Sequence, residues 1–370
     1  MKFSINKDEF LKVLITADSI INPRTPLSIL LNVYIEVHND GQMMLFSYNG
    51  DHGVKIETNV DVQEAGKISV LSKKLLEIIR NIPGDRIEIE HQEGQLEVII
   101  RPEGKTSPTF RLHGVSADTY PVFKEFNWES YLKLNQSTLR ELITCTEFAV
   151  SNDMSQIAFT GTFVKESADG LLSFVATDGK RLAVITKPIE EKNGEIILDI
   201  IVPQRIMKTV SDALGYGDVL FSVKEGQAYF KIDNVYIFTN LVEGKFPNYR
   251  DVIPDQSAST LVVGASELSL CLSRVAIMSD NESGRIKLDV DNNMLTVSSS
   301  TVQGEGFDTL GIEYSGEPTS VAVNHKALTD FLRVLQGKKV LISMNSPNSP
   351  ILLMPSGESD YEYITMPMKV

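Results

Sequence analysis

One pattern of residues occurs three times along this chain of 370 residues, at equal intervals. The copies read FSINKDEFLKVLITAD from Phe3, LKLNQSTLRELITCTEFA from Leu132 and LVVGASELSLCLSRVA from Leu261. Each begins with an apolar, strand-like run, passes a polar break and ends in an apolar stripe at helical spacing. The matching apolar positions are Phe10, Leu139 and Leu268; Val13, Leu142 and Cys271; and Leu14, Ile143 and Leu272. The pattern predicts a strand followed by an amphipathic helix in each copy.

A second repeated segment follows the first in every copy. It reads VLSKKLLEIIRNI from Val70, IVPQRIMKTVSDAL from Ile201 and AVNHKALTDFLRVL from Ala322. The helix-start position holds Ser72, Pro203 or Asn324, and a capping side chain or a proline suits a first turn whose N–H groups lack partners. The apolar stripes are Leu75, Ile79 and Ile82; Ile206, Val210 and Ala213; and Ala327, Phe331 and Val334. We expect a second amphipathic helix per copy, with a cation immediately before each stripe: Lys74, Arg205 and Lys326.

Three copies of a two-helix unit predict three similar domains of about 110–130 residues. We place them at residues 1–128, 129–256 and 257–370, with linkers at Asn127 to Ser130 and Asp255 to Thr260. Between the helices, alternating apolar residues and Gly-containing turns indicate antiparallel hairpins. Helices segregated to one face of antiparallel sheet make the fold class α+β. The alternative is a single domain whose amphipathic helices look alike.

The net charge of −14 argues at first against a nucleic-acid partner. The distribution of charge changes that expectation, because the six predicted helices carry equal numbers of cations and anions. The excess acid therefore lies in strands and loops. Near-neutral helices beside acidic sheets suggest two surfaces that face different partners, although helix surfaces of mixed charge are also common.

The sequence indicates a cytoplasmic protein without a membrane partner. No run of about 18 apolar residues is present, so no membrane-spanning helix is expected. The first residues, MKFSINKDEF, lack the apolar core of a signal peptide. The cysteines, Cys145 and Cys271, fall on predicted buried helix faces, as is usual for reduced thiols in the cytosol.

Motifs of catalysis and metal binding are missing from the sequence. The five histidines are scattered, with no H-x-x-x-H pair or Cys/His cluster suited to a metal. Gly104-Lys105-Thr106 resembles the end of a phosphate-binding loop, but Ile99 stands where the first glycine belongs. No G-x-S-x-G or G-x-G-x-x-G motif occurs. We therefore expect no catalytic residues, no metal and no cofactor.

Three segments contain residues that suggest a binding role besides a structural one. A turn at 177–182, TDGKRL, places two cations between apolar strands, and a Gly/Pro-rich segment, GKFPNYR, follows at 244–250. The last residues, ITMPMKV at 364–370, are apolar almost to the chain end, whereas chain ends are usually polar. Two methionines beside a proline suggest an adaptable apolar groove for partners. The alternatives are an ordinary turn, a domain linker and a final edge strand.

These motifs in this order, ATDGKRLAV, GKFPNYRDVIP and YITMPMKV on a threefold repeat, resemble the bacterial sliding clamp family, the β subunits of DNA polymerase III. The resemblance covers the whole chain. It implies two subunits joined head to tail in a ring of six domains, with helices lining a hole around double-stranded DNA of any sequence. It also implies a non-catalytic cytoplasmic protein at the nucleoid, to which the polymerase α subunit, the clamp loader, other polymerases and repair proteins bind through short peptide motifs.

By position, the resemblance implies a peptide groove between domains 2 and 3. Its residues would be Thr177, Gly179, Lys180, Arg181, Leu182, Pro247, Val252, Ile364, Met366, Pro367, Met368 and Val370. Lys180 stands where the family often has histidine, and Asp251 where the usual pattern has a second arginine. We expect these differences to alter the charge preference of the groove and to leave its apolar pocket intact.

The resemblance also implies the surfaces for DNA and for the second subunit. The DNA-facing residues would be Arg24, Lys74, Arg205 and Lys326. At the dimer interface, Phe110 and Leu112 would meet Ile277 and Met278 of the partner subunit. A protein that slides should bind phosphates loosely and read no bases, and cations at one register among nearby acids fit that need.

Two other classes of function remain open from the residues alone. A repeat-built protein scaffold that never meets DNA would agree with the acidic composition. An enzyme, such as a phosphate-ester hydrolase using clustered acids, would need a single carboxylate on which activity depends.

Overall fold

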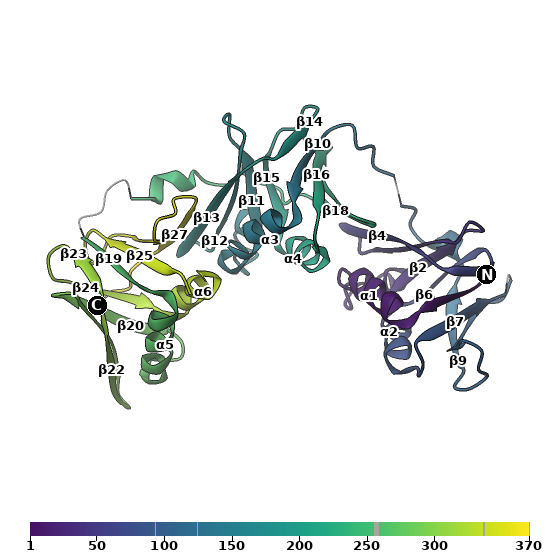
Figure 1. Ribbon diagram of the computed structural model, residues 1–370, viewed down its shortest axis with the longest axis horizontal. Helices are drawn as coiled ribbons and strands as arrows, with labels where there is room; N and C mark the ends of the chain where they lie inside the picture. Colours follow the sequence, from purple (N-terminus) through teal and green to yellow (C-terminus); the bar gives the residue numbers. More distant parts are fainter. Residues whose placement is uncertain (93, 124, 255–258, 336, 370) are drawn as a thin grey trace. The chain divides into compact units, whose positions relative to one another are not determined.

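The computed structural model describes residues 1–370 except 93, 124, 255–258, 336 and 370 (Figure 1). The chain forms two compact units. Unit 1 comprises Met1–Leu139, Ile189–Ile197 and Arg205–Leu241, and unit 2 comprises Arg140–Pro188, Leu198–Gln204 and Val242–Val370. Within the described residues, no helix has both the length and the apolar character needed to cross a bilayer.

Unit 1 is built on one antiparallel sheet of 14 strands, in the order β14-β10-β16-β17-β18-β4-β3-β2-β6-β9-β8-β7-β1-β5. The first repeat supplies β1 (Lys2–Asn6), β2 (Asn32–Val37), β3 (Gln42–Tyr48), β4 (His52–Asn59), β5 (Asp61–Glu64), β6 (Gly66–Leu71), β7 (Arg86–His91), β8 (Glu97–Pro102) and β9 (Phe110–Val115). The second repeat supplies β10 (Tyr131–Asn135), β14 (Glu191–Asn193), β16 (Asp218–Lys224), β17 (Gln227–Ile232) and β18 (Val235–Asn240).

Unit 2 contains a nine-stranded sheet and a four-stranded sheet. The first has the order β15-β11-β12-β13-β27-β26-β25-β19-β23, and the second β22-β21-β20-β24. Strands of the second repeat are β11 (Gly161–Glu166), β12 (Leu171–Thr177), β13 (Arg181–Pro188) and β15 (Asp199–Pro203). Those of the third are β19 (Ser259–Gly264), β20 (Arg285–Asp291), β21 (Met294–Thr301), β22 (Gly304–Gly311), β23 (Glu313–Ser315), β24 (Thr319–Asn324), β25 (Lys339–Met344), β26 (Ile351–Pro355) and β27 (Tyr361–Thr365).

The repeated segments form the predicted helices, and the α+β class with three two-helix repeats is confirmed. The helices are α1 (Lys7–Asp18), α2 (Ser72–Asn81), α3 (Gln136–Thr144), α4 (Gln204–Ala213), α5 (Ala265–Val275) and α6 (His325–Leu335). In unit 1, α1 packs on α2; in unit 2, α5 packs on α6, as Figure 1 also shows. In each pair the apolar stripes face the sheets and leave the other helix faces open.

Most of the predicted stripe residues are buried, and the exceptions have local causes. Leu139, Leu142 and Leu268 are fully buried, and each such leucine contributes about 1.5–3 kcal/mol of transfer free energy. In α6 the predicted Phe331 is fully buried, whereas the predicted Ala327 and Val334 are half-buried and the neighbouring Leu328 and Leu335 are buried instead. The apolar face of α6 is thus centred on Leu328, Phe331, Leu332 and Leu335.

The helix starts use different solutions for the free N–H groups. The Asn324 Oδ1 accepts hydrogen bonds from the backbone N–H of Lys326 (2.8 Å) and Ala327 (3.3 Å), as predicted for a cap. Pro203 is the last residue of β15, immediately before α4. Ser72 does not cap α2; its Oγ donates to Asp18 Oδ1 at 2.7 Å, and so ties the start of α2 to the end of α1.

Strand pairing joins neighbouring repeats. In unit 1, β18 of the second repeat pairs with β4 of the first, with Phe238 opposite Gly53. In unit 2, β13 of the second repeat pairs with β27 of the third, with Leu182 opposite Ile364. From the sequence we predicted only linkers between the repeats and not this strand pairing. Pairing between strands far apart in sequence leaves no short-range pattern. Each pairing also covers strand edges that would otherwise expose unpaired backbone groups.

Candidate functional site

The turn between β12 and β13 is fixed by side-chain hydrogen bonds. The Asp178 Oδ1 accepts from the backbone N–H of Lys180 (2.9 Å) and of Arg181 (3.0 Å). The Thr177 Oγ1 accepts from the Gly179 N–H at 3.0 Å and donates to the Arg181 carbonyl at 2.6 Å. Gly179 has a φ of +83°, a conformation that favours glycine. The turn therefore holds its two cations in defined positions.

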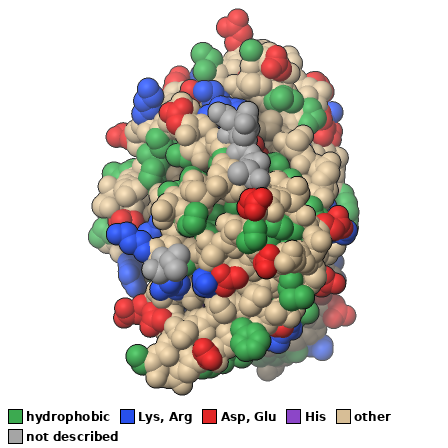
Figure 2. Space-filling model, turned by 90° about the vertical axis from the view of Figure 1, so that its left-hand side faces the viewer, with side chains coloured by type: hydrophobic (Ala, Val, Ile, Leu, Met, Phe, Trp, Pro, Cys, Tyr) green, Lys and Arg blue, Asp and Glu red, His purple; other side chains and the backbone are tan. Residues whose placement is uncertain are grey.

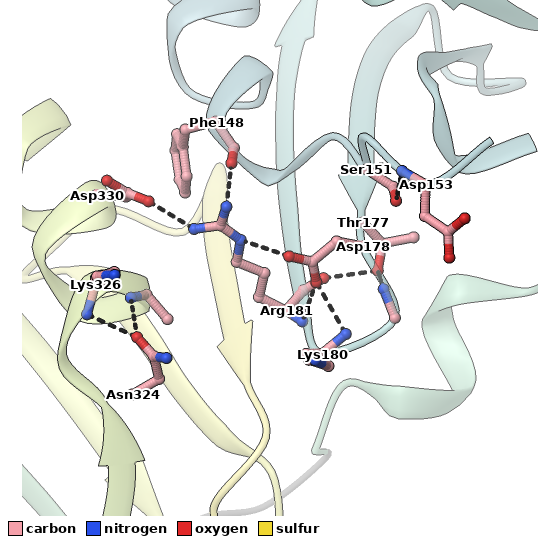
Figure 3. Close-up of polar contacts among 12 residues, drawn as sticks. Phe148, Ser151, Asp153, Thr177, Asp178, Lys180, Arg181, Asn324, Lys326 and Asp330 are labelled. Atoms are coloured by element: carbon pink, nitrogen blue, oxygen red, sulfur yellow. Dashed lines mark hydrogen bonds and ion pairs between the residues drawn. The ribbon is translucent and has the colours of Figure 1, made fainter. Parts of the chain in front are cut away.

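Arg181 connects three parts of unit 2 (Figure 3). Its Nε donates to Asp178 Oδ2 (3.0 Å), its Nη1 to Asp330 Oδ2 on α6 (2.7 Å), and its Nη2 to the Phe148 carbonyl (2.5 Å). Burial lowers the pKa of Arg181, but the hydrogen bond to Asp330 together with the negative charges of Tyr363, Asp178 and Asp330 outweighs that effect, and the net pKa is raised. The guanidinium is therefore a fixed charge that joins the turn to the third repeat.

A cavity of about 180 Å³ lies beside this turn in unit 2. Its lining residues are Phe159, Thr177, Gly179, Lys180, Arg181, Leu182, Pro247, Asn248, Tyr249, Val252, Ile364 and Met366. Leu182 and Ile364 form a buried floor that continues into the core, while Val252 (48 % exposed) and Met366 (44 % exposed) stand at the rim. The arrangement suits one or two apolar side chains inserted from outside.

Most residues predicted for the groove line this cavity, and a few do not. Pro367 and Met368 are absent from the lining, because the chain turns away: the Met368 N–H donates to the Ala322 carbonyl on β24 at 2.7 Å. Val370 lies outside the described residues. Sequence reasoning missed Phe159, Asn248 and Tyr249; the last two fall inside the GKFPNYR segment, which was a usable signal.

Lys180 and Asp251, the two residues at the groove that differ from the usual family pattern, have different surroundings. The Lys180 side chain is exposed at the rim of the cavity. Asp251 is also exposed, and its Oδ1 accepts a hydrogen bond from Asn248 Nδ2 at 2.6 Å. Asp251 therefore braces the 3₁₀ turn η5 (Tyr249–Val252), and Lys180 is the group able to contact a ligand.

The predicted DNA-facing cations are exposed, but their environments differ. Lys74 Nζ pairs with Glu77 Oε2 at 2.8 Å on the surface of α2. Arg205 Nη2 donates to the carbonyls of Ser19 (3.2 Å) and Ile21 (2.9 Å), where α1 ends. Lys326 lies in the first turn of α6, and Arg24 lies in the loop that follows α1. Arg205 thus has a structural role in unit 1 besides its charge.

The residues predicted for a subunit interface lie beside strand edges. On β9, Gly114 and Val115 pair with β6, whereas Phe110 and Leu112 pair with β8 alone among the described strands. In unit 2, β22 has β21 as its partner in the four-stranded sheet and forms the sheet edge. Both strands therefore offer backbone groups to a further strand.

Apolar side chains lie on β22 and next to it, at the edge of its sheet. Ile277, in η6 (Ala276–Met278), is 80 % exposed. Met278 instead packs on β22, where Gly304 and Gly306 leave room for its side chain. Sequence reasoning missed Phe307 on β22, which is 73 % exposed. Figure 2 views the side of the molecule that carries this sheet and shows hydrophobic side chains among acidic and basic ones.

Neither a metal cluster nor a reactive thiol is found in the part of the chain that the structure describes. No three His, Cys, Asp or Glu side chains there are grouped to hold a metal ion. Cys145 and Cys271 are buried, and burial raises the pKa of Cys145 to about 12 and that of Cys271 to about 11. Both thiols are protonated at neutral pH and serve packing.

Comparisons with known proteins cover the whole chain. Models of the DNA polymerase III beta subunit match as the N-terminal domain over residues 1–124, the central domain over 133–248 and the C-terminal domain over 250–369. The beta sliding clamp of Treponema pallidum is 31 % identical over 377 residues, with 100 % of each chain covered.

Solved structures agree with these matches. The DNA polymerase III subunit beta of Pseudomonas aeruginosa, bound to griselimycin, matches with a TM-score of 0.90 and 26 % identity, covering 100 % of both chains. The sliding clamp of Bacillus subtilis matches in fold with a TM-score of 0.92 at 23 % identity, covering 100 % of this chain and 99 % of that one.

Proposed function

The chain belongs to the family of bacterial sliding clamps, the DNA polymerase III beta subunits, and from that membership we propose how it assembles, holds DNA and binds partners. Its function is that of a DNA sliding clamp, a non-catalytic processivity subunit of DNA polymerase III. We assign its domains to residues 1–128, 129–256 and 257–370; the last boundary lies outside the described residues. Its place of action is the cytoplasm, at the nucleoid.

Two subunits form a closed ring by pairing β9 of one subunit with β22 of the other. The open edges of both strands support this pairing. Phe110 and Leu112 then meet Ile277 and Met278 of the partner subunit, and Phe307 joins the same apolar contact. Because each subunit offers one edge of each kind, head-to-tail pairing uses both edges of every subunit once the ring closes.

The helices line the hole and hold duplex DNA weakly. Lys326 and Arg24 supply cations, and Lys74 supplies one already balanced by Glu77. Contacts to phosphates carry no sequence information, so the ring slides without regard to sequence. The acidic excess elsewhere, within a net charge of −14, repels DNA from the other surfaces. Retention then comes from topology and not from affinity.

The cavity beside the β12–β13 turn binds short peptide motifs of partner proteins. These partners are the polymerase α subunit, the clamp loader, other polymerases and repair proteins. The observation that carries this proposal is the apolar floor of Leu182 and Ile364 under a rim that includes Met366. One or two apolar anchors give docking that is specific and readily exchanged.

The mass of the assembly in solution tests the ring. We expect the mass of a dimer, and Ile277→Asp should reduce it to that of one chain, because an aspartate cannot be buried without a partner. Ile197→Asp is the matched control, since Ile197 is 86 % exposed and belongs to the segment between β14 and β15, outside both β9 and β22. A single-chain mass for the unchanged protein would overturn the proposed ring and favour the scaffold alternative.

A further inference from the structure

A second and larger cavity, of about 550 Å³, lies in unit 1. Its lining includes residues of β3, β17 and β18, around the pairing of β18 of the second repeat with β4 of the first. Figure 1 shows these two strands. Its lining residues are Phe46, Tyr48, Pro121, Val122, Glu125, Phe126, Asn127, Lys224, Glu225, Gln227, Tyr229 and Phe238. None of them was assigned a role above.

The turn beside this cavity has the same construction as the turn beside the peptide groove. Between β3 and β4, the Asn49 Oδ1 accepts from the N–H of Asp51 (3.0 Å) and of His52 (2.9 Å). Asp178 makes the same two bonds in its own turn. Gly50, with a φ of +105°, takes the place of Gly179.

The neighbouring elements also correspond. In unit 1, His52 lies opposite Thr239 of β18; in unit 2, Arg181 lies opposite Thr365 of β27. Pro121 lines the unit 1 cavity, as Pro247 lines the groove. The unit 1 cavity is therefore the structural counterpart of the groove at the preceding repeat junction.

The walls of this cavity are aromatic where those of the groove are largely aliphatic. Phe126 stacks on Tyr229 (ring centroids 3.8 Å apart), Tyr229 on Phe238 (6.3 Å) and Phe238 on Tyr48 (6.0 Å). Val122 stands at the rim with 88 % of its surface exposed. Such stacked faces attract cations as well as apolar groups.

The turn beside the cavity and the cavity lining carry different charges from those of the groove. Asp51 and His52 occupy the turn positions of Lys180 and Arg181, and burial lowers the pKa of His52, so that His52 is neutral at pH 7. Glu125 and Glu225 both line the cavity, beside Lys224.

One of these carboxylates is already balanced. The buried Lys55 Nζ pairs with Glu125 Oε1 at 2.6 Å and with Glu57 Oε1 at 2.8 Å. Glu225 makes no ion pair among those found in the described residues, and it offers its charge to a ligand. A cationic group on that ligand would complement the charge of Glu225.

We propose that this aromatic cavity is a second docking site, which binds a short peptide segment carrying a lysine or arginine next to an apolar anchor. The anchor packs among the lining residues Val122, Phe126 and Phe238. The cation lies over the face of Phe126 that is turned away from Tyr229, within reach of Glu225. A partner could thus be held at this site by a motif that the groove, with Lys180 at its rim, disfavours.

Trp128 reports occupancy directly. It is the only tryptophan of the chain, and its ring packs edge-on against the lining residue Phe126, with centroids 4.9 Å apart. The probes are acetylated Ala-Lys-Leu-Leu amide and its analogue with glutamate in place of lysine. We expect the lysine peptide to change the Trp128 fluorescence saturably and to bind at least about fivefold more tightly than the glutamate peptide, as a cation–π contact predicts.

Two variants that each add one positive charge test where the peptide binds. Val122→Lys adds a cation at the rim and should weaken the lysine peptide about fivefold or more. Ile197→Lys adds the same charge at a residue that is 86 % exposed and outside the lining, and it should leave the affinity unchanged. Deletion of residues 366–370, which damages the groove, should also leave it unchanged. Equal affinity of the two peptides, no saturable fluorescence change, equal effects of the two lysine variants, or loss of binding on the deletion would each overturn the proposal.

Discussion

The Nη1 of Arg181 lies 2.7 Å from the Oδ2 of Asp330, and this ion pair joins the second repeat to the third. Both side chains are mostly covered, with 18 % and 26 % of their surfaces exposed. Arg181 also lines the peptide groove. The pair therefore couples the shape of the groove to the packing of α6 against the second repeat.

Replacing Asp330 by alanine should destabilise unit 2 and weaken the groove. The change leaves a partly buried guanidinium with fewer partners, which lowers the free energy of unfolding by about 1–3 kcal/mol. The control is Glu358→Ala, because its pair with Lys338 (2.7 Å) is half exposed and contributes about 0–1 kcal/mol. Denaturant titration measures both values, and equal losses would contradict the role given to Arg181–Asp330.

Deleting Met366 to Val370 should abolish partner-peptide binding and leave the dimer assembled. Met366 forms part of the groove rim, and its N–H donates to the Lys180 carbonyl at 2.9 Å. We expect a loss of affinity of about tenfold or more, as for a central interface residue. Lys369→Ala, at an exposed position outside the lining, is the control. Fluorescence anisotropy with a labelled clamp-binding peptide measures the affinity of each variant. Unchanged affinity after the deletion would refute the groove assignment.

Changing Lys74, Arg205 and Lys326 together to alanine should weaken DNA association and reduce its salt dependence. Each phosphate contact contributes about 0.9 to the slope of log K against log salt. Arg205 already donates hydrogen bonds to the Ser19 and Ile21 carbonyls, and it therefore has fewer donors for a phosphate. We therefore expect the slope to fall by about two, as for two phosphate contacts.

The matched control for that experiment removes the same charge from strands. Lys133, Lys165 and Lys339 each pair with a carboxylate on another strand of the same sheet. Their triple alanine variant should keep the slope of the unchanged protein. A slope unaltered by the helix variant would place the DNA-binding cations elsewhere.

Stability should fall as the pH drops below about 6.5, in part because of His52. Burial lowers the pKa of His52 below its ordinary 6.5, as does the charge of Arg205, while Asp51 opposes them. The unfolded chain therefore binds a proton more readily than the folded one, and stability rises with pH through this window. His52→Gln should lose less stability between pH 7.5 and pH 5.5 than the unchanged protein. Identical losses in denaturant titrations would show that His52 is not protonated differently in the two states.

The sequence predicted the features that repeat and missed those that join the repeats. Phe10, Leu139 and Leu268 revealed three helices because helix periodicity is local. The pairings of β18 with β4 and of β13 with β27 depend on strands far apart in sequence. Asp330 was visible only as one anion on a predicted helix, and nothing in the sequence indicated that it would meet Arg181.

The candidate groove was accessible from the sequence only through motif resemblance. Residues within the three motifs, such as Leu182, Pro247 and Ile364, lie together around one cavity. Phe159 belongs to no motif, and its place in the lining follows from the fold. Pro367 and Met368 belong to a motif but lie outside the lining, since the Met368 backbone pairs with β24.

The most direct test of the central claim is retention on DNA of different topology. The protein is loaded onto nicked circular DNA with a clamp loader and ATP, and the complex is isolated by gel filtration in salt that suppresses phosphate contacts. A ring held by topology stays on the circle and is released when the same DNA is cut once to a linear form. Equal retention on both forms, or retention on neither, would contradict the account.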